Sequence, residues 1–315
     1  LTGSLDYYIR SVKDLLIEGV GVAVPSRTLG TIEGNVSNLE LTSSGVELAL
    51  SYEVANSSKF SYTPSLTFAT YNSIVEDNGA TDGLTFSDGF ELVSSTPGAP
   101  GQNGDPISQI RFGDELGGIY TRVLDLEASR AAGALVFVDQ DGDAAEEGGD
   151  PLVDADDKVL VGNGLPDFSI GLQNQFSFGA VDFSFFLRGD FGHDLANMNG
   201  NFYGYQGNLD NRPIDNVINN DQLLGLDVSG TPAFSDYFVE DASFLVLDNA
   251  QLGFNIDLPD TSPFRSIRPY IAGQNLFYIT NYSGFDPNVR YNDRGNALVQ
   301  GIDRRNTYYR TRSFT

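Results

Sequence analysis

Residues 182–191 read Asp-Phe-Ser-Phe-Phe-Leu-Arg-Gly-Asp-Phe, and this stretch decides the fold. Successive side chains on a β-strand point to opposite faces of the sheet. Phe183, Phe185 and Leu187 therefore share one face, while polar residues such as Ser184 hold most of the other. The alternation predicts a strand with one apolar and one mainly polar side.

The preceding segment, 168–178, alternates in the same way, and only Gly179-Ala180 separates the two predicted strands. Strands in soluble sandwiches usually have about five or six residues. These two are longer, close to the roughly 9–11 residues with which a tilted strand crosses a bilayer. Long strands that are apolar outside and polar inside, joined by short turns on one side, are typical of outer-membrane barrels.

The same pattern predicts eight strands along the chain. They are 5–16, 44–55, 59–75, 167–178, 181–193, 242–256, 267–280 and 306–315. The connections between them alternate in length. The short ones are 56–58, 179–180 and 257–266, and the long ones are 17–43, 76–166, 194–241 and 281–305. We therefore expect an all-β fold, an antiparallel transmembrane β-barrel with long extracellular loops and a periplasmic C-terminus.

Two of the long connections are expected to be extracellular substructures. Residues 76–166 are too many for a structureless loop, so they are predicted to form a large loop subdomain with an acidic loop, in which the apolar run 133–138 forms a short strand. Residues 194–241 are predicted to form a second extracellular loop.

The composition limits the classes of function. The 315 residues carry 43 acidic and 18 basic side chains, a formal net charge of −25, so nucleic acid is not an expected partner. There is no cysteine, which excludes disulfides and thiol chemistry. The excess of acidic residues fits a solvated surface. Two more specific alternatives are that the protein binds cations and that it is adapted to salty water.

An acidic run in the 76–166 connection is a candidate cation site. The carboxylates that could bind Ca²⁺ are Asp139, Asp141, Asp143, Asp150 and Asp157. The first three stand at positions 1, 3 and 5, a spacing that suits the oxygen ligands of calcium. Position 6 is Ala144, not the glycine of an EF-hand loop, so a solvated acidic loop remains the alternative.

Aromatic residues suggest two further roles. Tyrosines near strand ends predict a girdle at the membrane interface: Tyr7, Tyr8, Tyr278, Tyr282, Tyr308 and Tyr309. Three aromatic residues of the 194–241 loop are candidates for ligand or partner contact: Phe202, Tyr203 and Tyr205. No catalytic motif is evident, and the single histidine, His193, is expected to form surface hydrogen bonds, so no enzyme is predicted.

Several segments together resemble the SusC/RagA family of TonB-dependent outer-membrane transporters. They are 7–16 (YYIRSVKDLL) with 44–48 (SGVEL), 139–143 (DQDGD) with 157–163 (DKVLVGN), 235–245 (SDYFVEDASFL), and 273–277 (GQNLF) with 282–287 (YSGFDP). They span nearly the whole chain in the order of the family's own segments. The last two are the most specific.

The resemblance implies that the chain is the C-terminal part, the last eight or so strands, of a barrel of about 22 strands. The N-terminal plug, the segment that contacts TonB and the earlier strands would precede it, and a few residues would follow Thr315. The family implies TonB-dependent import of an oligosaccharide or peptide, with a SusD-like surface lipoprotein as partner. The alternative hypothesis is a secreted, calcium-binding β-rich module for adhesion or ligand binding.

Overall fold

The computed structural model describes most of the chain. The described residues are 1–21, 31–57, 59–77, 92–95, 107–140, 142, 157–203, 234–289, 300–304 and 310–315. Asp141, Asp143, Asp150 and Tyr205 lie outside these ranges. Among the described residues, no helix has both the length and the apolar character that crossing a membrane requires.

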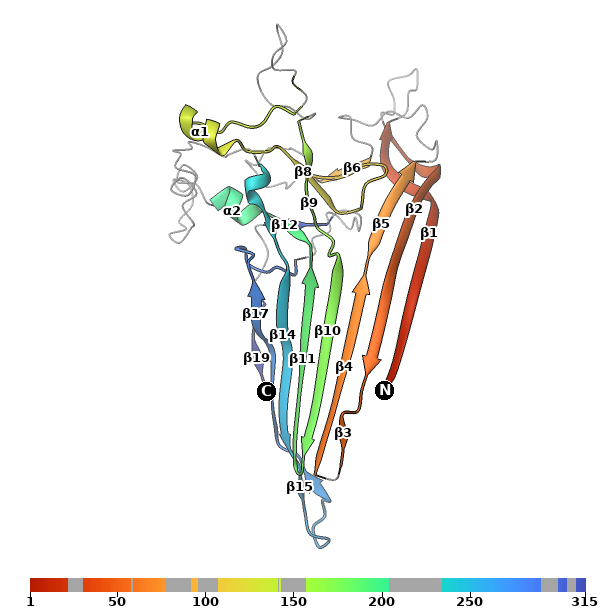
Figure 1. The fold of residues 1–315 in the computed structure, drawn as a ribbon, viewed down its shortest axis with the longest axis vertical. Helices are drawn as coiled ribbons and strands as arrows, with labels where there is room; N and C mark the ends of the chain where they lie inside the picture. The colour runs from red at the N-terminus through yellow and green to blue at the C-terminus, as the bar shows by residue number, and fades with distance from the viewer. Residues whose placement is uncertain are drawn as a thin grey trace.

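A curved antiparallel sheet forms the body of the molecule (Figure 1). Its strands follow one another in chain order: β1 (Thr2–Gly21), β2 (Thr31–Ser51), β4 (Phe60–Thr70), β10 (Phe168–Phe178), β11 (Val181–Phe191), β14 (Phe244–Phe254), β17 (Tyr270–Thr280) and β19 (Ser313–Phe314). Two short strands extend it, β3 (Ala55–Asn56) beside β4 and β5 (Asn72–Asp77) beside β2. Seven of the predicted strands are present; of the eighth, 306–315, only Ser313–Phe314 form a strand among the described residues. The prediction of an antiparallel barrel sheet is confirmed.

The register places the apolar rows on one face of the sheet. One such row runs across five strands: Tyr62, Phe176, Phe183, Leu252 and Ile271. The adjacent row, on the other face, is mainly polar: Thr63, Gln175, Ser184, Gln251 and Ala272. The alternation read from residues 182–191 therefore holds across neighbouring strands and divides the sheet into an outer apolar and an inner polar face.

The outer face leaves large apolar side chains uncovered. Phe183 is 38% exposed, Leu252 50% and Ile271 69%. A water-soluble protein rarely presents so continuous an apolar surface, whereas a barrel in lipid requires it. The outer face is therefore the lipid-facing surface of a transmembrane barrel, of which these strands form a part.

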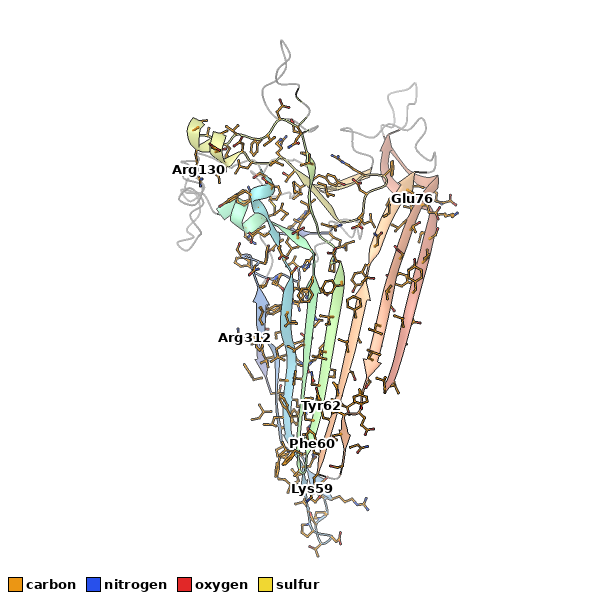
Figure 2. All side chains as sticks on the ribbon, in the orientation of Figure 1. Lys59, Phe60, Tyr62, Glu76, Arg130 and Arg312 are labelled. Carbon is orange, nitrogen blue, oxygen red and sulfur yellow. The ribbon has the colours of Figure 1, made fainter. Side chains whose placement is uncertain are left out.

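The two ends of the sheet differ as the alternating connections predicted (Figure 1). At the narrow end, Phe178 pairs with Val181 across a two-residue turn in which Gly179 has a φ of 57°. A positive φ at the first turn residue is the type II′ arrangement, which glycine adopts without strain. Figure 2 places Lys59 and Phe60 at this same end, and Glu76 and Arg130 at the other.

The strands next to the N-terminus extend beyond their predicted limits. β1 reaches Gly21 and β2 begins at Thr31, so the predicted loop 17–43 was too long. The extension of β2 is paired with β5, whose register runs from Asn72 opposite Ser44 to Asp77 opposite Leu39. Polar and apolar residues do not alternate cleanly at the end of β1 and the beginning of β2. The sequence pattern therefore did not predict these extensions.

The apolar run 133–138 does not form the predicted strand. It follows α1 (Leu126–Ala132), and Gly133 ends that helix in the left-handed region with a φ of 69°. Beyond it only one bridge forms, between Leu124 and Phe137. The Val136 N–H donates instead to Ser129 Oγ on α1 at 2.8 Å, so the run is held by the helix before it.

Two small sheets lie at the wide end, and a third lies at the narrow end. The first consists of β6 (Leu92–Ser95), β7 (Ser108–Ile110), β8 (Gly118–Thr121) and β9 (Val159–Asn163), and the second of β12 (Asp194–Asn197), β13 (Val239–Asp241) and β18 (Ile302–Asp303). Helices α2 (Met198–Tyr203) and η4 (Asp236–Phe238) lie beside the second sheet. The third is the hairpin of β15 (Ile256–Asp257) and β16 (Ser266–Ile267).

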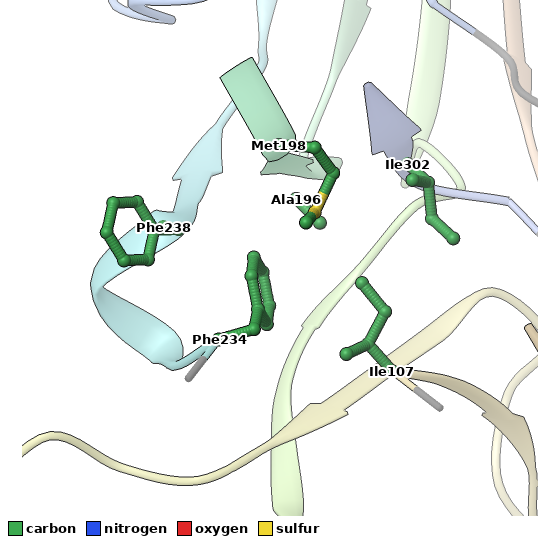
Figure 3. Packing of buried hydrophobic residues seen from close by; sticks show 6 residues of the cluster. All are labelled: Ile107, Ala196, Met198, Phe234, Phe238 and Ile302. Carbon is green, nitrogen blue, oxygen red and sulfur yellow. The ribbon is translucent and has the colours of Figure 1, made fainter. Parts of the chain in front are cut away.

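Elements at the wide end pack around a hydrophobic core, beside which Leu195, Ala242 and Tyr282 form a second, smaller cluster. We call the described parts of 107–163, 194–241 and 281–304 the cap. The buried residues of its main core come from all three connections: Ile107, Ala196, Met198, Phe234, Phe238 and Ile302 (Figure 3). Burial of apolar side chains is the main favourable term in folding. The three long connections are therefore folded onto one another, not independent loops.

A polar pair interrupts the outer face near its middle. The Tyr62 hydroxyl donates to Asn174 Oδ1 at 2.9 Å, and the Tyr62 ring stacks on Phe176 with centroids 4.3 Å apart. Asn174 is only 4% exposed, so the aromatic rings shield it. Its Nδ2 atom has no hydrogen-bond partner within the described residues.

Replacing Tyr62 by Phe should lower the free energy of unfolding by about 1–3 kcal/mol, because Asn174 Oδ1 becomes a buried acceptor without a donor. Urea titration of the full-length protein in lipid measures this loss. The double variant Tyr62→Phe with Asn174→Leu is the control: it removes both polar groups and should recover much of the stability. An unchanged unfolding curve for Tyr62→Phe would show that the pair contributes nothing.

Nitroxide labels at Phe183 and Ile271 should be accessible to lipid-soluble oxygen in nanodiscs, because both positions lie on the outer face. Labels at Ser184, the residue after Phe183, and at Gln251, its partner on β14, are matched controls on the inner face. They should respond instead to water-soluble quenchers. Equal behaviour of the two sets would contradict the assignment of the faces.

Candidate functional site

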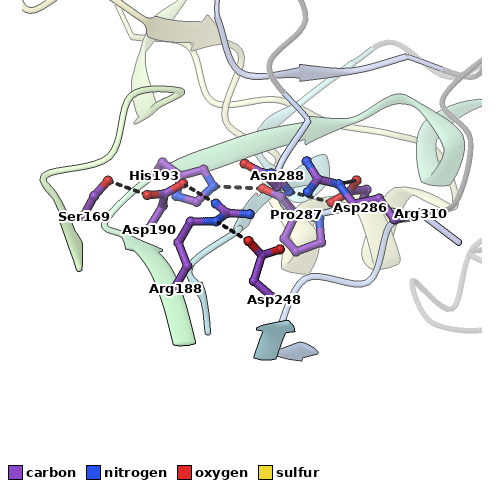
Figure 4. Close-up of polar contacts among 9 residues, drawn as sticks. All are labelled: Ser169, Arg188, Asp190, His193, Asp248, Asp286, Pro287, Asn288 and Arg310. Atoms are coloured by element: carbon purple, nitrogen blue, oxygen red, sulfur yellow. Dashed lines mark hydrogen bonds and ion pairs between the residues drawn. The ribbon is translucent and has the colours of Figure 1, made fainter. Parts of the chain in front are cut away.

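Polar contacts gather where the barrel meets the cap (Figure 4), and the first group of them lies within the barrel strands. Arg188 lies 3.5 Å from Asp190 and 4.0 Å from Asp248, and its guanidinium stands 5.3 Å from the centroid of the Phe244 ring. Ser169 Oγ donates to Asp190 Oδ1. Arg188 is thus held by two carboxylates and an aromatic face, an arrangement that favours the charged guanidinium in a partly buried place.

His193 is buried at the junction, so the expectation that it lies at the surface was wrong. Its Nε2 is 2.9 Å from the carbonyl oxygen of Pro287, and its ring meets Phe244 edge to face. Because a carbonyl only accepts, Nε2 carries the proton in this contact. The histidine thereby fastens the segment after β17 to the end of β11.

The Glu240 carboxylate joins two of the chain segments that make up the cap, 194–241 and 281–304. Its Oε1 accepts from Asn197 Nδ2 and from Ser283 Oγ, each at 2.8 Å, and its Oε2 accepts from the Ser283 backbone N–H at 2.8 Å. Asn197 Oδ1 in turn accepts from the N–H of Gly200 and so caps α2. A single carboxylate therefore fixes the relative positions of β12, β13 and the segment after β17.

Tyr282 is a second buried connection. Its hydroxyl donates to Asp303 Oδ2 at 2.7 Å. Burial, together with the negative charge of Asp303, raises the pKa of Tyr282 far above its usual value, so it remains a donor at any physiological pH. Because Tyr282 is buried, it does not belong to the predicted interfacial girdle.

The first residue of β12, Asp194, and the last residue of β13, Asp241, bring two carboxylates together. Burial raises the pKa of Asp194, and the negative charge of Asp241, its cross-strand neighbour, acts in the same direction. The backbone N–H of Asn163 donates to Asp194 at 3.1 Å and opposes this shift. Among the residues the structure describes, no three His, Cys, Asp or Glu side chains are grouped closely enough to hold a metal ion.

The inner face of the sheet is hollowed below the cap. The hollow has a volume of about 460 Å³. Its lining includes three carboxylates, one guanidinium and smaller polar and aromatic groups: Asp6, Glu47, Thr67, Phe186, Arg188 and Asp190. Such a wall presents hydrogen-bonding groups and net negative charge to the space that the barrel encloses.

The acidic loop is described only at its two ends. Asp139 Oδ1 accepts from the N–H of Gly142 at 2.6 Å, and Asp157 Oδ1 accepts from the N–H of Gln140 at 2.6 Å. Asp157 is buried, and its hydrogen bond with Gln140 holds the two described ends of the loop together. The remaining predicted ligands lie outside the described residues, and calcium binding stays a prediction.

The predicted partner aromatics are only partly placed. Phe202 and Tyr203 belong to α2, next to the cap core, whereas Tyr205 lies outside the described residues. Sequence reasoning did not single out Arg188, Glu240 or Ser283 as connecting residues. A signal existed for the last two, because Glu240 and Ser283 fall in the segments 235–245 and 282–287 that carry the family resemblance.

Comparison with known proteins adds to this geometry. No protein-family model matches the chain. It is 24% identical to TonB-dependent receptor P39 of Formosa agariphila over 96% of its length, and 25% identical to TonB-dependent receptor SusC of Bacteroides thetaiotaomicron over 92%. It spans 32% and 28% of those two proteins.

Solved structures agree with this. The RagAB peptide transporter superposes with a TM-score of 0.66 over 99% of the chain and 32% of the transporter chain, at 18% identity. In sequence and in fold the chain is similar to a barrel portion of SusC/RagA-type outer-membrane transporters. The barrel of which it forms a part thus resides in the outer membrane, with the cap, built from the long connections, on the extracellular side and the short turns of the narrow end toward the periplasm.

Replacing Glu240 by Ala should loosen the cap without unfolding the barrel, since it leaves the Ser283 N–H unpaired at a cost of about 1–3 kcal/mol. Hydrogen exchange at Ser283 and limited proteolysis of the cap in the full-length protein measure this effect. Glu76→Ala removes an exposed glutamate from β5 and serves as the control. Unchanged exchange in Glu240→Ala would show that Glu240 does not hold the cap.

Proposed function

We propose that the whole protein imports a bulky nutrient, an oligosaccharide or a peptide, across the outer membrane with energy from TonB. The single observation that carries the proposal is the two-faced sheet, apolar toward lipid and polar toward a hollow beneath the cap. In this reading the chain supplies part of the wall of the import path and part of its extracellular mouth.

The character of the inner wall supports a polar substrate. The hollow presents carboxylates, the Thr67 hydroxyl and the Phe186 ring. Hydroxyl-rich sugars and peptide backbones are recognised by such hydrogen-bonding groups with occasional aromatic contacts. One structural relative is described as a peptide transporter. The relatives are receptors and transporters, which agrees with the expectation that the protein is not an enzyme.

A SusD-like surface lipoprotein is the partner that we propose for the cap. The cap is a folded platform, and described parts of loops 76–166 and 194–241 both contribute to its main hydrophobic core. Phe202, Tyr203 and Tyr205 are proposed as contacts with that partner or with the ligand, since aromatic residues are enriched in interface cores. The TonB complex would act through segments outside residues 1–315.

Calcium is proposed for the acidic loop as a stabiliser of the cap. Asp139 and Asp157 hold the two ends of the loop, and the intervening sequence contains further carboxylates such as Asp141 and Asp143. Crowded carboxylates repel one another unless a cation or solvent separates them. Oxygen ligands of this kind suit Ca²⁺.

A secreted, calcium-binding adhesion module is the competing hypothesis. It does not account for the exposed outer face, because an apolar surface of that size would promote aggregation in water. The transporter hypothesis explains the same surface as the contact with lipid.

Deleting the gene should abolish growth on one class of oligosaccharide or on peptides, and complementation should restore growth. Removing TonB should have the same effect as the deletion. The measurement is growth, with uptake of labelled substrate, on a panel of glycans and on peptide mixtures. Unchanged uptake of every substrate after the deletion would contradict the proposed import.

A further inference from the structure

The hairpin of β15 and β16 is unlike the other turns at the periplasmic end. Two connections there are minimal, whereas this hairpin continues below them as a separate two-stranded element (Figure 1). β14 already has 11 residues, enough to cross a bilayer. The hairpin therefore begins where the membrane-spanning part of the sheet has ended.

The hairpin has a defined backbone. Leu258 N–H donates to the Arg265 carbonyl at 2.9 Å, and Ser262 N–H donates to the Pro259 carbonyl at 2.8 Å. At its root, Asn255 N–H donates to the Ala180 carbonyl at 2.7 Å. The hairpin is consequently fixed relative to the barrel, and the directions of its side chains follow from those of the sheet.

The outer apolar face continues into the hairpin without interruption. Leu252, Phe254 and Ile256 follow one another at alternate positions and are all exposed. Ile256 pairs with Ile267, which is 51% exposed. The polar pair Asp257 and Ser266 lies on the opposite side, so the hairpin is two-faced like the barrel strands.

The hairpin carries one aromatic side chain, Phe264, one basic residue, Arg265, and two carboxylates, Asp257 and Asp260. Phe264 is 67% exposed. Arg265 next to it and Lys59 on the neighbouring turn have no carboxylate partner within the described ranges. Exposed aromatic rings favour the interface of a bilayer, and free cations favour lipid phosphates.

We propose that residues 256–267 form a foot that lies in the headgroup layer of the periplasmic leaflet, with Ile256, Phe264 and Ile267 toward the acyl chains. The occupant of this surface is phospholipid. The argument is continuity, because the apolar face of the foot extends the lipid-facing surface of the barrel. The foot would fix the depth and tilt of the barrel in the membrane, which is independent of what the protein transports.

The test uses the full-length protein in phospholipid nanodiscs with a single introduced cysteine carrying a nitroxide. Labels at Phe264 and Ile267 should be quenched by oxygen several-fold more effectively than by a water-soluble nickel complex. A label at Asp260, in the turn of the same hairpin, is the matched control and should show the reverse preference.

Two outcomes would overturn the proposal. If the label at Phe264 is as accessible to the nickel complex as the one at Asp260, the foot projects into water. If it is immobilised and accessible to neither quencher, protein covers this surface in place of lipid. Phe264→Trp offers an independent readout, since in nanodiscs that contain brominated lipid its emission should be quenched only if the ring enters lipid.

Discussion

Backbone hydrogen bonding in the absence of water is the constraint on which the rest of this structure depends. Within hydrocarbon, every N–H and C=O group must find a protein partner, and a closed sheet is one of the two arrangements that allow it. The long strands between β1 and β17 meet this requirement with a neighbour on each side. Once the backbone is paired, each side chain has only two directions, and the alternation of apolar and polar residues follows directly.

The cap obeys the opposite rule. Outside the membrane, water is present, and apolar groups are driven inward. Ile107, Phe234 and Ile302 belong to three different connections and meet in one core. Polar links from Glu240 then hold the cap together, and His193 joins it to the barrel rim. Apolar residues thus lie on the outside of the barrel strands and on the inside of the cap. The change between the two arrangements marks the boundary between membrane and water.

The barrel could be predicted from sequence because its signal is local. Alternation along residues 182–191 and the short connection 179–180 determine strand and turn without knowledge of the remaining chain. The cap could not, since contacts such as that between Ile107 and Ile302 join residues far apart in sequence and follow no period. The surface position predicted for His193 was wrong for this reason, because its partner, the Pro287 carbonyl, belongs to a distant segment of the chain. Tyr282 was likewise assigned to the girdle although Asp303 holds it inside.

A map of the full-length protein in lipid nanodiscs, at a resolution that shows backbone hydrogen bonds, tests the central claim most directly. Among the described residues, β1 pairs only with β2, and β19 pairs only with β17, so each leaves one edge open. The account predicts that the open edge of β1 is hydrogen-bonded to a strand from outside residues 1–315, in a closed barrel with its apolar face toward lipid. Pairing of β1 with β19 in a complete small barrel, or a second protein sheet packed on the outer face, would contradict it.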